Sequence, residues 1–310
     1  MSAPVTRPAT LGASSVGAIL GLSPFASAWK VWAELRGILP REDVQTGPMW
    51  LGTVLEDHIR ERWAAEQGVQ VAPGLKIEDA PIYPTDETPA WRHARPDGFI
   101  DLGIEPGSAR FDLVEIKAVL FSESPEWGED GTDQIPLYYQ PQIVHQADVV
   151  ECSENYGLVR GTHVIACDRA RGDLRTYWIP HDRERARRMR AVLRDWYVEH
   201  IENGTQPDPD ASEACRLAAA ALYMRPAKTW TTPTDDDRRA VADLIELRAH
   251  RDAVDTACAT IENRLRLRIA SDAGLAGLVS WTHRGRKGQP AAGRLTIWNN
   301  ADTTPRNDDV

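Results

Sequence analysis

The stretch RPDGFIDLGIEPGSARFDLVEIKAV, residues 95–119, contains the pattern that decides the fold. Its second half alternates apolar and polar residues with the two-residue period of a β-strand. Residues two apart in a strand point to the same face, so Glu115 and Lys117 are predicted to project together, with Val114 and Ile116 on the opposite face. Asp97 lies on the neighbouring segment, where it can supply a second carboxylate.

A charged face on a half-buried strand is costly unless its charges meet a partner or a metal ion. The carboxylates of Asp97 and Glu115, together with the main-chain carbonyl of Ile116, form an oxygen set that suits Mg²⁺ or Mn²⁺. Lys117 beside them can orient a water or help to deprotonate it. Taken alone, the pair is better explained as an ordinary Glu–Lys ion pair on an exposed strand face, because such pairs are common.

Composition excludes several other classes of protein. The net charge of −10 over 310 residues argues against a general nucleic-acid coat protein, although a local basic groove remains compatible with it. The four cysteines are scattered without a CxxC pair, which favours free thiols in a reducing compartment over a zinc or iron–sulfur site. No signal peptide is recognisable and no apolar run approaches the roughly 20 residues of a membrane span, so we expect a cytoplasmic protein with no membrane partner.

The order of predicted elements indicates an α/β protein. Three helices, the last over residues 50–67, precede short strands at 69–72, 91–94, 98–102 and 111–119. A helix over 137–150, two strands at 156–167 and 174–181 and a helix over 183–201 follow. Residues 205–212, TQPDPDAS, are the best linker candidate. We therefore predict a core at 1–210 with a central mixed sheet flanked by helices, and a C-terminal extension at 211–310 made of a helical hairpin and a small β tail.

The spacing of Pro96-Asp97 and Glu115-Ile116-Lys117 resembles the PD-(D/E)xK nuclease motif. The surrounding sequence resembles the YqaJ-type viral recombinases, the family that includes phage lambda exonuclease. Four more stretches carry this resemblance, namely LGASSVGAILGLSPFAS, GTVLEDHI, IPLYYQPQIVHQADVV and the closing WYVEHIENGTQPDPD. The resemblance covers about residues 7–210 and implies a restriction-endonuclease-like fold.

The resemblance also implies roles for residues outside the strand motif. Glu56 would complete a second metal site or hold a metal-bound water, so that two Mg²⁺ or Mn²⁺ ions are expected. Gln142 would position the water or the phosphate, whereas Gln146, one turn along, is interpreted as structural. Arg7 and Ser14 would bind a 5′-phosphate, with Ser14 donating beside a helix N-terminus.

The function implied by the resemblance is metal-dependent exonuclease activity of phage-type recombination. Such an enzyme would resect linear duplex DNA from 5′ to 3′ and leave a 3′ single strand for a single-strand annealing protein. The chain would be encoded by a phage or prophage, act in the bacterial cytoplasm, and form a homo-oligomeric ring. The alternatives are a Cas4- or RecB-like nuclease and a non-catalytic DNA-end-binding protein.

Overall fold

The computed structural model describes residues 10–40, 47–78, 90–105, 108–153, 157–223, 230–270, 273–276, 278–282 and 294–297. The chain forms two compact units, Met1–Pro226 and Ala227–Val310. None of the helices in these described ranges has the length and apolar character needed to span a bilayer. The first unit contains the sheet with the sequence motif, and each unit is described separately below.

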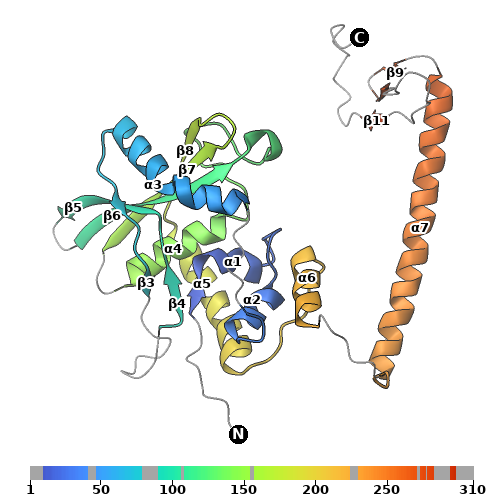
Figure 1. Ribbon diagram of the computed structural model, residues 1–310, viewed down its shortest axis with the longest axis horizontal. Coiled ribbons are helices and arrows are strands. Elements are labelled where there is room, and N and C mark those ends of the chain that lie inside the picture. The colour runs from blue at the N-terminus through green and yellow to red at the C-terminus, as the bar shows by residue number, and fades with distance from the viewer. Residues whose placement is uncertain are drawn as a thin grey trace. The chain divides into compact units, whose positions relative to one another are not determined.

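A five-stranded mixed sheet forms the centre of the first unit (Figure 1). Its spatial order is β2 (Ala72–Pro73), β5 (Gly98–Glu105), β6 (Ser108–Val119), β7 (Leu158–Asp168) and β8 (Leu174–Pro180). The central strand β6 pairs antiparallel with β5 and parallel with β7, which places Glu115 beside Val164 and Lys117 beside Ala166. The α/β fold class predicted from the sequence is confirmed, and the strand that carries the motif lies in the middle of the sheet.

Two helices cover the two faces of this sheet. Helix α3 (Gly47–Gln67) buries Ile59 and Trp63 against Val114 and Ile116 of β6. Helix α4 (Gln140–Cys152) lies on the opposite face, where its apolar residues pack against the odd-numbered residues of β6. The predicted alternation along β6 is therefore confirmed, and Glu115 and Lys117 project toward α4.

A second layer of helices completes the first unit. Its apolar core unites α1 (Ala13–Ile19), α2 (Ala28–Leu35), α5 (Arg183–Tyr197), the π-helical turn Val198–Glu202 and α6 (Glu213–Leu222). A small sheet of β1 (Leu11–Gly12), β4 (Arg92–Ala94) and β3 (Ile77–Glu78) joins this layer to α4. The contact between this small sheet and α4 includes a buried ion pair, in which Arg92 Nη1 of β4 lies 2.5 Å from Asp148 Oδ2 of α4. These contacts fix α4 on the sheet and with it the glutamines that face β6.

The C-terminal elements differ in detail from the sequence prediction. Helix α6, expected as the first half of a hairpin, buries Cys215 and Ala218 in the core that α2 shares, because its apolar side is complementary to that layer. The second unit contains one long helix, α7 (Asp235–Ile269), and an antiparallel sheet of β9 (Gly274–Leu275), β10 (Val279–Thr282) and β11 (Arg294–Ile297). The compact units thus divide after Pro226, and the domain boundary at residue 210 stays a prediction.

Candidate active site

The residues of the sequence motif line one cleft of about 880 Å³ in the first unit. Strand β6 supplies Glu115, Ile116 and Lys117, and the segment that leads into β5 supplies Asp97. Helix α3 contributes Glu56, α4 contributes Gln142, and α1 contributes Ser14. The structure therefore brings together all of the predicted site residues except Arg7, which lies outside the described residues.

Asp97 is held against the motif strand by two main-chain contacts. Its amide donates to the carbonyl of Val114 at 2.9 Å, and its carboxylate Oδ2 accepts from the amide of Ile116 at 2.7 Å. Burial and the neighbouring Glu115 carboxylate raise the pKa of Asp97 to about 8. At neutral pH this carboxyl accordingly holds a proton that a bound cation would displace.

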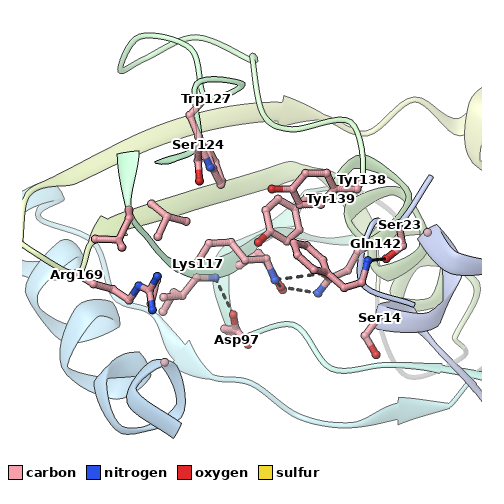
Figure 2. A pocket seen from close by; sticks show the side chains of 18 of the residues that line it. Ser14, Ser23, Asp97, Lys117, Ser124, Trp127, Tyr138, Tyr139, Gln142 and Arg169 are labelled. Carbon is pink, nitrogen blue, oxygen red and sulfur yellow. Dashed lines mark hydrogen bonds and ion pairs between the residues drawn. The ribbon is translucent and has the colours of Figure 1, made fainter. Parts of the chain in front are cut away.

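Glu115 is surrounded by donors. Its Oε1 accepts from Lys117 Nζ and, at 2.5 Å, from Gln142 Nε2, while Lys117 Nζ also donates to Gln142 Oε1 at 3.2 Å (Figure 2). Burial acts to lower the pKa of Lys117, but the carboxylates of Glu115 and Asp97 outweigh it and raise that pKa. Lys117 is thus a cation that neutralises part of an acidic cluster.

Gln146 is a site residue whose role the sequence interpretation missed. Its side chain is buried, and Nε2 donates to Glu115 Oε2 at 2.9 Å and to the carbonyl of Arg95 at 3.3 Å. The available signal was the spacing of Gln142 and Gln146, because residues four apart on a helix face the same way. Both glutamines hold Glu115, one through each carboxylate oxygen.

Glu56 stands on the α3 side of the cleft. Burial raises its pKa, Arg95 counters this effect, and Glu115 reinforces it, so Glu56 lies within electrostatic reach of the motif. Among the described residues, however, no group of three or more His, Cys, Asp or Glu side chains has a geometry that could hold a metal ion as it stands. Lys117 Nζ and Gln142 Nε2 both contact Glu115 Oε1, an oxygen that a cation could also use.

The chemistry of the donor set fits a hard divalent cation. Glu56, Asp97, Glu115 and the Ile116 carbonyl offer oxygen ligands only, which Mg²⁺ and Mn²⁺ prefer. Burial raises the pKa values of Asp97 and Glu56, and the nearby Glu115 carboxylate adds to the rise for both. A cation would relieve the repulsion among these carboxylates.

Arg169 is a second residue that sequence reasoning missed. It follows β7 directly, and its amide donates to the carbonyl of Val119 at 2.8 Å, which fixes the turn beside the end of β6. The side chain lines the cleft, with Gln142 on the other side of Lys117 in Figure 2. Its buried Nε has no hydrogen-bond partner among the described residues. An arginine with an unused donor is suited to bind a phosphate oxygen.

Aromatic side chains form another wall of the cleft. Phe25 is 68% exposed and meets Tyr138 edge-on with ring centroids 5.5 Å apart, and Tyr138 contacts Tyr139 at 4.5 Å. Lys117 Nζ lies 5.0 Å from the centroid of the Tyr139 ring. Phe25, unlike the buried Trp29 and Trp32, is therefore free to contact a base in this cleft.

Ser14 reaches the cleft from α1 because this helix packs closely against the start of α4. A Cβ at Gly17 would lie 3.0 Å from the carbonyl oxygen of Tyr138, so glycine permits this close approach. The helix begins at Ala13 with Gly12 as its N-cap. Ser14 is consequently an exposed residue of the first turn that lines the cleft.

Comparison with protein-family models gives a match over residues 5–153. The matching family is the YqaJ-like viral recombinase domain. The resemblance inferred from the sequence motifs is confirmed over that range, and the match supports a phage-type exonuclease. The range contains every predicted site residue. No curated protein sequence matches the chain.

Solved structures with similar coordinates include an alkaline exonuclease, LHK-Exo, from Laribacter hongkongensis. It shares 20% identity over 64% of this chain and 90% of its own, with a TM-score of 0.45. The same enzyme in complex with dAMP gives 20% identity, the same coverage and a TM-score of 0.46. A third structure, SSO0001, gives 12% identity over 73% of this chain and 90% of its own, with a TM-score of 0.39.

Proposed function

We propose that this protein is a metal-dependent DNA exonuclease that resects linear duplex DNA from 5′ to 3′. One observation carries the proposal: Asp97, Glu115, Lys117 and Gln142 line one cleft, and Glu115 contacts both Lys117 and Gln142. A non-catalytic end-binding protein would need charge in this cleft, but it would not need a buried acid bonded to a lysine and a glutamine with a second acid beside it.

We assign Asp97, Glu115 and the Ile116 carbonyl to one Mg²⁺ or Mn²⁺ ion, with Glu56 serving a second ion or a metal-bound water. Bound there, the metal would activate the attacking water and stabilise the charge that develops on the scissile phosphate. Glu115 is held in place for this role through both of its carboxylate oxygens. Its fixed orientation supports the assignment, since ligands held by outer partners bind metals best.

Lys117 and Gln142 are assigned to the attacking water and the phosphate. Lys117 Nζ contacts Glu115 in the metal-free site, and with a cation bound by Glu115 it would contact a non-bridging phosphate oxygen or the water. Gln142 offers an amide donor and an amide acceptor, and the acceptor can hold one proton of the water. The two side chains would thereby set the direction of attack.

The remaining lining of the cleft supports a nucleic-acid substrate. Arg169 would bind a backbone phosphate, while Phe25 and Tyr138 would contact bases of the end being degraded. Ser14, with Arg7, would bind a terminal 5′-phosphate. The product, a 3′ single strand, is the substrate of a single-strand annealing protein, which we propose as the partner in the cytoplasm of a phage-infected or lysogenic host.

Helix α5 contributes little to the proposed DNA path. Five of its six arginines contact groups on this chain: Arg183 binds Glu151, Arg185 binds Gln140, Arg187 and Arg188 approach Glu184, and Arg190 approaches Asp148. Their charge is largely compensated within the fold. The basic helix is accordingly interpreted as a solvated face.

The decisive experiment incubates the full chain with linear duplex that is labelled on one strand at the 5′ end, and separately at the 3′ end. With Mg²⁺ we expect mononucleotides to be released from the 5′ ends, and excess chelator should stop the reaction. Asp97→Ala and Glu115→Ala should each abolish release while DNA-end binding persists. Full activity in chelator, or wild-type activity in either variant, would overturn the assignment.

A further inference from the structure

Helix α7 is a 35-residue helix with an uncovered apolar stripe. A capping box between Thr234 and Asp237 fixes its start, and nearly all of its residues are exposed. Large apolar side chains are among them, including Leu247 at 65% and Ile261 at 55% exposure. An isolated helix gains no stability from apolar groups that stay in water, because helices in proteins owe most of their stability to a packed face.

The stripe repeats every seven residues. Spacings of three and four residues alternate along it, as in the seam of a coiled coil. We call it the α7 seam, and it consists of Ala240, Leu244, Leu247, Arg251, Val254, Cys258, Ile261 and Leu265. Ile245 and Leu267 are apolar and exposed but lie off the seam.

We propose that the α7 seam pairs with the α7 seam of a second copy of this chain as an antiparallel two-stranded coiled coil. Full overlap of the two helices sets Leu244 opposite the partner's Ile261, and Leu247 opposite the partner's Cys258. Apolar residues then meet apolar residues or the thiol along most of the interface. The proposal concerns the second unit alone and does not depend on the nuclease function.

The charges that flank the seam match a second copy. In the same register, Asp243 meets the partner's Arg264, and Arg248 meets the partner's Asp255, each twice by symmetry. These four residues have no ion pair or hydrogen bond among the residues that the structure describes. Other arginines of the helix contact acids on α7 itself, as Arg238, Arg239, Arg251 and Arg266 do. These four charges, which lack a partner among the described residues, thus lie where a partner helix can pair them.

Arg251 selects the antiparallel orientation. In a parallel pair it would face the partner's Arg251 inside the seam, where two like charges are poorly solvated. In the antiparallel pair it faces the partner's Val254, and its aliphatic stem can pack there while the guanidinium reaches solvent.

Disulfide trapping in the full-length protein tests the orientation. All four cysteines are free, and Cys258 is the exposed one. Leu247→Cys should give a covalent dimer through the partner's Cys258 under mild oxidation, and Cys258→Ser in the same chain should abolish it. Ile245→Cys is the matched off-seam control and should add no cross-link. A Cys258–Cys258 dimer formed by the wild type would show a parallel pair and overturn the proposed orientation.

Light scattering after gel filtration tests the interface. The wild type should have the mass of a dimer or a multiple of it, and Leu247→Asp should halve that mass. Ile245→Asp adds the same charge to the same helix off the seam and should leave the mass unchanged. A monomeric wild type, a mass that Leu247→Asp leaves unchanged, or equal effects of the two variants would each overturn the proposal.

Discussion

Gln146 Nε2 donates a hydrogen bond to Glu115 Oε2 at 2.9 Å, while Gln142 binds the other oxygen of the same carboxylate at 2.5 Å. Two residues one helical turn apart thus hold one acid from the same side. This arrangement assigns Gln146 to positioning the acid, in addition to its packing inside α4.

Replacement of Gln146 by alanine should lower activity by about 10–100-fold, the usual effect of losing an outer partner of a metal ligand. The apparent affinity for Mg²⁺ should fall with it, so excess Mg²⁺ should restore part of the rate, and a purely structural role would give no such rescue. Gln140→Ala on the same helix is the control, because Gln140 contacts Arg185 and does not line the cleft. A Gln146→Ala enzyme with unchanged Mg²⁺ dependence would contradict this role.

Asp97 should make both stability and metal affinity depend on pH. Its pKa is raised from 3.8 to about 8, so between these values the native state holds a proton that the unfolded chain lacks. The contribution of Asp97 to the free energy of unfolding of the metal-free protein should therefore decrease as pH rises through this window. Asp97→Asn should remove that slope, as measured by urea unfolding across the pH range in chelator.

Metal binding has the opposite dependence on pH, because the proton on Asp97 competes with the cation. We expect Mg²⁺ affinity, followed by calorimetry, to increase as pH rises toward 8 and to level off above it, and the proton release below pH 8 should make the measured heat depend on the buffer. Affinity that is flat across this range would separate Asp97 from the metal site.

The sequence predicted the strand motif well because the physics behind it is local. A two-residue period decides that Glu115 and Lys117 share a face, and the packing of Val114 and Ile116 on α3 follows from the same period. The contact of Gln146 with Glu115 was not predictable to the same degree, because it depends on how α4 packs on β6. Arg169 was missed for the same reason, since only the return of the chain after β7 brings it beside Lys117.

Charge pairing was also beyond reach of the sequence. The sequence of the arginine run in α5 is compatible with a phosphate-binding surface but favours a solvated face, and the partners of these arginines on α4 and on α5 itself support the solvated face. The placement of α6 could not be predicted from the sequence either. Its apolar side is visible in the sequence, but only the folded chain shows that α2 covers it.

Arg169→Ala should weaken the binding of the DNA substrate more than it weakens the binding of the metal ion. The side chain lines the cleft and carries a positive charge, so it should contribute a phosphate contact. Loss of one such contact should raise KM for the DNA. It should also make the slope of log binding constant against log salt concentration shallower by about one, because one fewer counterion is released on binding. Lysine at this position should restore part of the DNA binding, since it keeps the positive charge but cannot form the bidentate hydrogen bonds of a guanidinium.

Arg171→Ala supplies the matched control for this experiment. Arg171 is exposed on the same turn and does not line the cleft. Equal losses in both variants would indicate a general effect of surface charge and remove Arg169 from the substrate site.

The last prediction concerns the terminal phosphate of the DNA. A 5′-phosphate carries more charge than an internal one, and Ser14 is exposed at the cleft where its hydroxyl can donate to such a group. We expect duplexes with 5′-phosphates to be degraded faster than duplexes with 5′-hydroxyls. Arg7→Ala should bring the rate on phosphorylated ends down to that on hydroxyl ends, and Ser14→Ala should reduce the preference less, because a neutral hydroxyl forms weaker hydrogen bonds than a guanidinium. The measurement is a competition between the two duplexes in one reaction, with each labelled differently. If wild-type protein degraded both at the same rate, Ser14 would be an ordinary surface residue of α1, and the end would be recognised through its bases alone.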